Sequence, residues 1–270
     1  MATVTSMNLS ELDGREYGPV SWLITDDSVD DFITLTGDDP TRWAESAPPG
    51  FAASALFAVA PDLLAELYEH SVVHGEQSFE WMGPLRRASA LEVAGRVSRL
   101  RERGDVYFVT FEMTATVAGR PVLNGKSLFL ASAESSPAGR APAARAEPPH
   151  SDTGDPRVGQ VSASRSDLVR YASATRDWNP VHWDHEAGIA AGFPGVVVHG
   201  LLQAAWALRA GSVGTESTTP FSSARFRFRN PLLPARPVDV SVSERGSAVE
   251  VVLGEGDTEY LTSAIELADE

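Results

Sequence analysis

Two stretches of the chain share one succession of polar and apolar positions. Residues 25–40 (TDDSVDDFITLTGDDP) and 164–180 (SRSDLVRYASATRDWNP) each start with a hydroxyl side chain suited to capping a helix. Each ends in a turn before a proline and is followed by a Pro-Gly pair, at 49–50 and 194–195. The pattern predicts two copies of one structural unit.

Long apolar segments come next in both copies. The segments FAASALFAVAPDLLAELY (51–68) and GVVVHGLLQAAWALRAG (195–211) are apolar on nearly every side, so each is predicted to be a long, enclosed helix. Residues 78–132 and 223–268 then alternate between apolar and polar positions, with Gly-containing turns between the runs. This alternation indicates antiparallel strands with one covered face. We therefore expect an α+β fold in which two curved sheets wrap two helices and join edge to edge.

A compositional change separates the two copies. Residues 134–158 are rich in Ala, Pro, Ser and Gly and lack apolar periodicity, which is typical of a linker. The predicted domains are residues 1–133 and 159–270.

Composition excludes several classes of function. The 270-residue chain is 43% hydrophobic, which is enough for a packed core. It has no cysteine, so disulfides, thiolate metal sites and a cysteine nucleophile are excluded. A net charge of −15 argues against nucleic acid as a partner. No apolar run has membrane-spanning length and no signal peptide is visible, so we expect a cytoplasmic protein that does not bind membranes.

Residues 176–187, RDWNPVHWDHEA, carry the main candidate chemistry. Pro180 fixes its own φ and keeps Asn179 out of the helical conformation, so Asp177 and His182 flank a rigid kink and can converge. A carboxyl group and an imidazole suit general acid–base catalysis. Alone, however, Asp and Asn before Pro are ordinary turn residues, and a lone histidine is more often structural.

The longer stretch YASATRDWNPVHWDHEAGIAAGFPGVVVHGLL (171–202) resembles the hydratase signature of the MaoC-like, (R)-specific enoyl-thioester hydratase and dehydratase family. The segment HGEQSFEWMGPL (74–85) more loosely resembles the N-terminal dehydratase-like half of double hot-dog members. The resemblance implies a double hot-dog fold, a pseudo-dimer in one chain, with a non-catalytic first half and a catalytic second half. It also implies reversible conversion of a trans-2-enoyl thioester to the (R)-3-hydroxyacyl thioester.

The resemblance assigns roles by position. It implies that Asp177 acts on the water or leaving hydroxyl and His182 on the α-carbon proton, although the residues alone leave open which side chain handles which proton. The amide of Gly200, at a helix start, would bind the enolate-like oxygen. Supporting roles fall to Asn179, which holds the loop, to His199, and to Trp178 as a wall of the acyl pocket.

Other features around the motif have competing interpretations. Arg176 stands where many family members have Gly, and its guanidinium would favour the ionised form of Asp177 or else face solvent. Arg225 and Arg227 alternate with phenylalanines. They are interpreted as a solvated sheet face or as contacts to phosphates of coenzyme A or phosphopantetheine. A metal site built from His182, His185 and His199 fits no zinc spacing, so no metal or redox cofactor is expected.

The first half of the chain lacks an equivalent of the Asp177 and His182 pair. At the corresponding turn, Asp38 matches Asp177 but Arg42 stands at the position of the histidine. We therefore expect no catalysis there, and expect the missing pair to free space for a long acyl chain. His74 is interpreted as structural, with lining of the acyl tunnel as the alternative.

The expected partner is an acyl-coenzyme A or acyl-carrier-protein substrate, and a homodimer is possible. Alternative functions are a hot-dog thioesterase, a dehydratase or cyclase of secondary metabolism, and a non-catalytic carrier-binding partner subunit. The intact Asp177 and His182 argue against the last of these.

Overall fold

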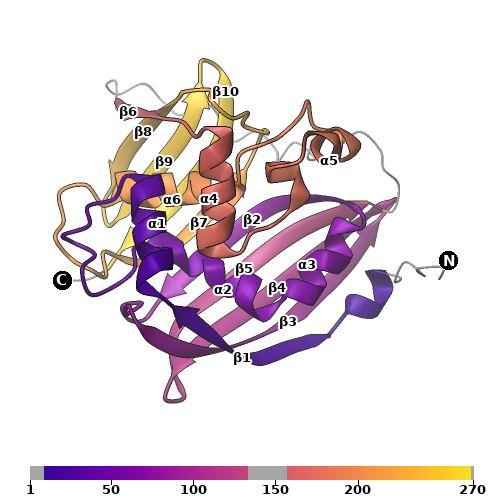
Figure 1. The fold of residues 1–270 in the computed structure, drawn as a ribbon, viewed down its shortest axis with the longest axis horizontal. Coiled ribbons are helices and arrows are strands. Elements are labelled where there is room, and N and C mark those ends of the chain that lie inside the picture. Colours follow the sequence, from indigo (N-terminus) through magenta and orange to yellow (C-terminus); the bar gives the residue numbers. More distant parts are fainter. Residues whose placement is uncertain (1–8, 133–156, 269–270) are drawn as a thin grey trace.

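The computed structural model describes residues 9–132 and 157–268, and within them ten strands form one antiparallel sheet (Figure 1). The strand order is β1-β3-β4-β5-β2-β7-β10-β9-β8-β6. The strands of the first half are β1 (Glu16–Ile24), β2 (Ser71–Trp81), β3 (Ser89–Arg103), β4 (Val106–Val117) and β5 (Arg120–Ser132). Those of the second half are β6 (Arg157–Val161), β7 (Phe221–Phe228), β8 (Val238–Arg245), β9 (Ala248–Glu255) and β10 (Thr258–Leu267).

The two halves contribute five strands each, and the strand order of the second half is the reverse of that of the first half, starting from the central β2–β7 pair. Each half places its first strand at an outer edge and its second strand at the centre, so β1 corresponds to β6 and β2 to β7. The two central strands pair antiparallel from Glu76 opposite Arg227 to Glu80 opposite Ser223. The predicted α+β double unit with sheets joined edge to edge is confirmed, and this joining leaves only β1 and β6 as edge strands.

Helices cover one face of this curved sheet, called the inner face below (Figure 1). The two capped helices form as predicted: α1 (Asp26–Thr36) is capped by Thr25, and α4 (Arg165–Thr175) has a capping box of Ser164 and Asp167. Short 3-10 turns are η1 (Leu9–Leu12), η2 (Pro49–Ala52) and η3 (Pro180–His182), and α5 (His185–Ala190) is a short helix.

The central helices of the two halves differ from each other. In the second half, α6 (Gly200–Gly211) is continuous, as predicted, and starts five residues later than the apolar run does. In the first half the prediction of one long helix is wrong, because α2 (Ala53–Val59) and α3 (Pro61–Tyr68) meet at 79°. Pro61 has no N–H to continue α2 and is suited to a first helical turn, so the chain breaks at Ala60 and α3 takes a new direction.

Most of the predicted linker, 134–158, lies outside the described residues. Its last two residues do not belong to a linker, because β6 starts at Arg157 and pairs with β8. Among the described helices, none is long and apolar enough on its own to span a membrane, while the bent pair Pro49–Val59 and Pro61–Tyr68 passes that test by length and composition only.

Candidate active site

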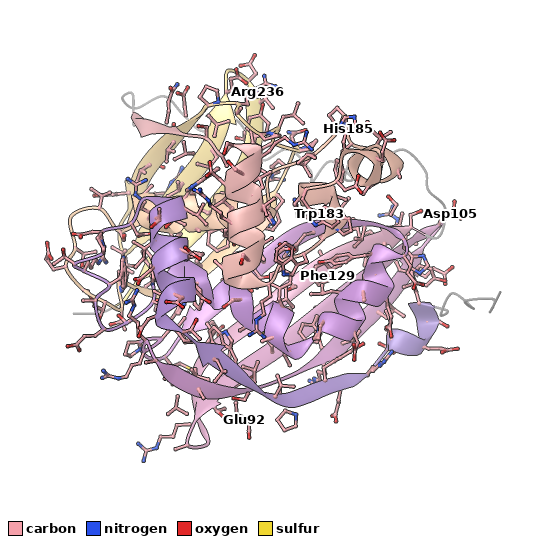
Figure 2. All side chains as sticks on the ribbon, in the orientation of Figure 1. Glu92, Asp105, Phe129, Trp183, His185 and Arg236 are labelled. Atoms are coloured by element: carbon pink, nitrogen blue, oxygen red, sulfur yellow. The ribbon has the colours of Figure 1, made fainter. Side chains whose placement is uncertain are left out.

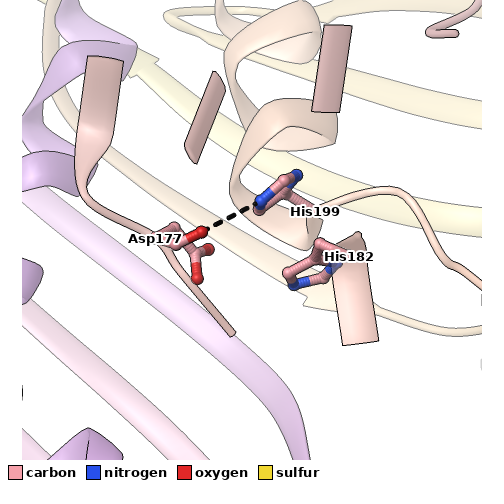
Figure 3. A group of neighbouring side chains, drawn as sticks. All are labelled: Asp177, His182 and His199. Carbon is pink, nitrogen blue, oxygen red and sulfur yellow. Dashed lines mark hydrogen bonds between the residues drawn. The ribbon is translucent and has the colours of Figure 1, made fainter. Parts of the chain in front are cut away.

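The loop between α4 and α6 brings three ionisable side chains together. Asp177, His182 and His199 offer ligand or proton-binding atoms that all lie within 4.8 Å of one another (Figure 3). Asp177 is 5% exposed, His182 9% and His199 fully buried. Asp177 and His182 therefore converge across the Asn-Pro kink, as predicted. His199, which was assigned only a supporting role, lies in direct contact with this pair.

Backbone geometry at the end of α4 aims Asp177 inward. Arg176 ends the helix in the left-handed conformation, at φ 67°, a position that usually favours glycine. Asn179 then caps η3, its side chain accepting a hydrogen bond from the Val181 N–H at 3.3 Å. The Asn179 N–H donates to Asp177 Oδ1 at 3.5 Å. Asn179 therefore holds the loop by side-chain-to-backbone bonding, as expected.

His182 is held by the strand-like segment before α6. Its Nδ1 lies 2.8 Å from the Val197 carbonyl oxygen, which can only accept, so Nδ1 carries the hydrogen. Nε2 is then left with a lone pair, the form that a general base needs. Val197 N–H in turn donates to the Val181 carbonyl at 3.1 Å, which ties the two arms of the loop together.

His199 connects the other members of the site. Its Nε2 donates to the backbone carbonyl of Asp177 at 3.3 Å, and its ring stacks on His182 with centroids 3.8 Å apart and planes at 25° (Figure 3). The lone pairs of the two stacked rings lie in nearly parallel planes and so do not converge readily on one ion, which fits a positioning role better than metal ligation.

Gly200 opens α6 directly beside these groups. The first N–H groups of a helix have no carbonyl of their own helix to bond, and they carry the positive end of its dipole. Gly200 is partly exposed, whereas its neighbours Val198, His199 and Leu201 are buried. A Cβ on Gly200 would lie 3.0 Å from the Phe228 ring, so the absence of a side chain lets that ring pack against the start of α6.

Burial sets the protonation of the pair. It raises the pKa of Asp177 to about 7, against a smaller lowering by the Asn179 N–H. It lowers the pKa of His182 to about 4, against a smaller raising by the Val197 carbonyl. A protonated carboxyl next to a neutral imidazole gives one proton donor and one proton acceptor in one site. Of the two interpretations of Arg176, the structure favours the one in which it faces solvent, since that side chain is exposed and the pKa of Asp177 is raised.

Two tyrosines that the sequence analysis did not single out also face Asp177. Burial, and after it the Asp177 charge, raise the pKa of Tyr68 and of Tyr171 well above 10. The Tyr171 ring lies 4.8 Å from His199, and its buried hydroxyl has no hydrogen-bond partner among the described residues. Tyr171 could have been identified from the sequence, because it lies on the buried face of α4 and within the stretch that resembles the family signature. Tyr68 belongs to the other half of the chain.

The remaining predicted site residues lie elsewhere. Trp178 is 50% exposed, which places its ring at the surface rather than in a pocket wall. Arg225 and Arg227 both bond Glu76 across the β2–β7 seam, Arg227 at 3.2 Å, while Phe226 between them is fully buried. The two arginines therefore lie on the outer face, opposite the site, which favours the interpretation as a solvated sheet face.

The corresponding turn of the first half is filled by its own side chains. Asp38 accepts from Thr36 Oγ1 at 2.5 Å and from Trp43 Nε1 at 3.3 Å, and no imidazole faces it. Arg42 bonds the Ser212 hydroxyl and the Ser217 carbonyl of the second half. The absence of an Asp/His pair agrees with the sequence prediction. The expected free space does not, because Trp43 is 1% exposed and occupies the turn.

Replacing Asp177 by Asn is expected to stabilise the fold at alkaline pH. A folded-state pKa raised from 3.8 to about 7 means that ionisation penalises the folded state. The penalty is absent below the unfolded pKa, grows as pH rises and is complete above about 7. It amounts to ~4 kcal/mol at most, of which we expect about 1–3 kcal/mol. Asp177→Asn should raise the melting temperature by several degrees at pH 8.

The check is a pair of thermal melts at pH 5 and pH 8. The gain for Asp177→Asn should be clearly larger at pH 8, and the exposed control Glu186→Gln should show no such difference. An equal gain at both values would mean that Asp177 is not held protonated by the fold.

Comparisons with known proteins agree with this fold, and one of them covers the segment that holds the site. The family model described as "MaoC like domain" matches residues 138–264, which include Asp177, His182, His199 and Gly200. The Drosophila melanogaster peroxisomal multifunctional enzyme type 2 is 24% identical over 220 residues, which is 74% of this chain and 37% of that enzyme. The chain thus spans little more than a third of that relative's length.

Solved structures match over nearly the whole chain. A MaoC-like dehydratase from Phytophthora capsici superimposes with a TM-score of 0.76 at 19% identity, covering 98% of this chain and 99% of that one. A Mycobacterium tuberculosis protein described as having a double hot-dog fold gives a TM-score of 0.65 at 13% identity, covering 98% and 99%. The described residues therefore have the double hot-dog fold, and the second half of the chain matches the MaoC-like domain model.

Proposed function

We propose that the chain catalyses the reversible addition of water to an acyl thioester, between the trans-2-enoyl and the (R)-3-hydroxyacyl forms. The observation that carries the proposal is the buried pair of Asp177 and His182 beside the N-terminus of α6. The dehydratases among the proteins that the chain resembles support the same reaction class.

The pair provides the proton transfers that dehydration requires. His182 Nε2 takes the proton from the α-carbon, and the electron pair moves onto the thioester oxygen as an enolate. The Gly200 N–H stabilises this oxygen. The electron pair then returns, the β-carbon–oxygen bond breaks, and protonated Asp177 gives its proton to the leaving hydroxyl, which departs as water. Hydration runs through the same steps in reverse.

Apart from the thioester itself, the reaction takes up or releases only water, so it balances without a redox carrier. Coenzyme A or phosphopantetheine enters as part of the substrate. A cytoplasmic location, a choice between coenzyme A and a carrier protein, and a possible homodimer remain predictions from the sequence.

The test is loss of the enoyl absorbance when the protein is mixed with trans-2-enoyl-coenzyme A esters of increasing chain length. We expect loss of absorbance and chiral analysis that gives the (R)-alcohol. The separate (R)- and (S)-3-hydroxyacyl esters serve as controls for the reverse reaction, and only the (R) form should react.

Other results would replace the proposal. Release of free coenzyme A without hydration would indicate a thioesterase. A folded protein that turns over neither coenzyme A esters nor carrier-protein esters would indicate a non-catalytic partner subunit.

A further inference from the structure

An irregularity in β2 turns one histidine of the first half toward the site. His74 pairs with Phe129 and Glu76 pairs with Leu128, so Gly75 is an extra residue in the strand. Residues two apart in a regular strand share a face, yet here Glu76 bonds the outer-face arginines while His74 lies with the inward Phe129. A Cβ on Gly75 would lie 2.6 Å from Leu130 Cδ1, so the bulge needs glycine.

His74 lies in an aromatic wall that continues to the site. Its ring centroid is 4.7 Å from that of Phe129 and 5.0 Å from that of Phe228, whose ring covers Gly200. Figure 2 places Phe129 on the helix-covered face of the sheet, in the region of α3 and of the loop that carries Trp183. His74 is thus one aromatic ring away from the amide assigned to the thioester oxygen.

One of the two ring nitrogens of His74 has no partner among the described residues. Its Nε2 is buried without a hydrogen bond among the described residues. Burial lowers the pKa of His74 to about 4, against smaller raising by hydrogen bonds to the Glu76 backbone and the Gln77 side chain, so the ring is neutral. The other nitrogen donates to the Glu76 carbonyl, which leaves Nε2 as a free acceptor. A buried nitrogen of this kind costs free energy unless something bonds it.

The inner face is incompletely covered at this point. Val72, His74 and Phe228 are only partly buried, whereas Gln77 and Phe79, further along β2, are buried. The start of β2 and the end of β7 are therefore the less covered part of these two strands.

We propose that His74 binds an oxygen substituent on the acyl chain, beyond the carbons that react, and so selects oxygenated acyl thioesters. The carrier end of the substrate must lead out to solvent, so a buried nitrogen faces the acyl end. A hydroxyl there donates the missing hydrogen bond to Nε2, and a plain alkyl chain leaves the nitrogen unpaired. This inference rests on the proposed function.

The test compares substrates within each variant. Trans-2-octenoyl-coenzyme A is assayed beside analogues that carry a hydroxyl at successive carbons beyond the β-carbon. For the best-placed hydroxyl, the wild type should show a kcat/KM about 10- to 100-fold above that of the plain ester. In His74→Phe this ratio should fall to about 1. His74→Gln, which keeps a donor and an acceptor, should retain part of it, and His70→Phe, in the turn before β2, should leave it unchanged.

Each other outcome decides against the inference. A wild type without preference, or a His74→Phe enzyme that loses activity on all esters at an unchanged ratio, would show that His74 does not read the acyl chain. No turnover of any ester by the wild type would remove the proposed function itself, and this inference with it.

Discussion

Asp177→Asn should lower kcat/KM for both hydration and dehydration by about 10³-fold, the range expected for loss of a general acid–base group. The asparagine can still accept the hydrogen bond that the Asn179 N–H donates to Asp177, so the loop geometry is preserved. What is lost is the proton for the leaving hydroxyl. Initial rates of the enoyl absorbance change measure the effect, and Glu186→Gln on α5 is the matched exposed control.

His182→Ala should cost a similar ~10³-fold, because it removes the base that takes the α-proton. The double variant should be little worse than either single one, since the two groups act in one step and such effects are not additive. A loss of less than ten-fold in Asp177→Asn, with a normal melting temperature, would contradict the assigned role of Asp177.

The second half of the chain was largely predictable because its signals are local. The cap at Ser164, the kink at Pro180 and the glycine that opens α6 lie within forty residues, and each acts on its immediate neighbours. The stacking of His199 on His182 was not predictable, since it depends on how the segment before α6 folds back against η3.

The first half shows where local reasoning fails. Pro61 is visible in the sequence, yet the apolar run around it is long enough to suggest an unbroken helix. Tyr68 was not singled out from the sequence, and for His74 lining of the acyl tunnel was only the alternative interpretation. They are more than a hundred residues from Asp177, and the bulge at Gly75 reverses the face that regular alternation assigns to His74. Such contacts follow from tertiary packing.

The dehydration rate should follow a bell-shaped dependence on pH. The reactive form has Asp177 protonated and His182 neutral, so kcat/KM should rise as pH passes about 4 and fall above about 7. The fall should be about tenfold per pH unit, hence ~100-fold by pH 9. Hydration uses the form in which one proton has moved from Asp177 to His182. That form carries the same number of protons, so the acidic rise and the alkaline fall (the two limbs of the profile) should lie at the same pH values for hydration as for dehydration.

The alkaline limb is the more informative part of the profile. The pKa values of Tyr68 and Tyr171 are raised well above 10, so neither tyrosine titrates between pH 6 and 9. Asp177 is then the group whose ionisation ends activity, and the residual rate of Asp177→Asn should be flat across that interval. A limb that persists in Asp177→Asn would assign the proton to another group. A limb in the wild type near the ordinary carboxyl pKa would mean that burial does not hold Asp177 protonated, and that the carboxylate acts first as a base toward water.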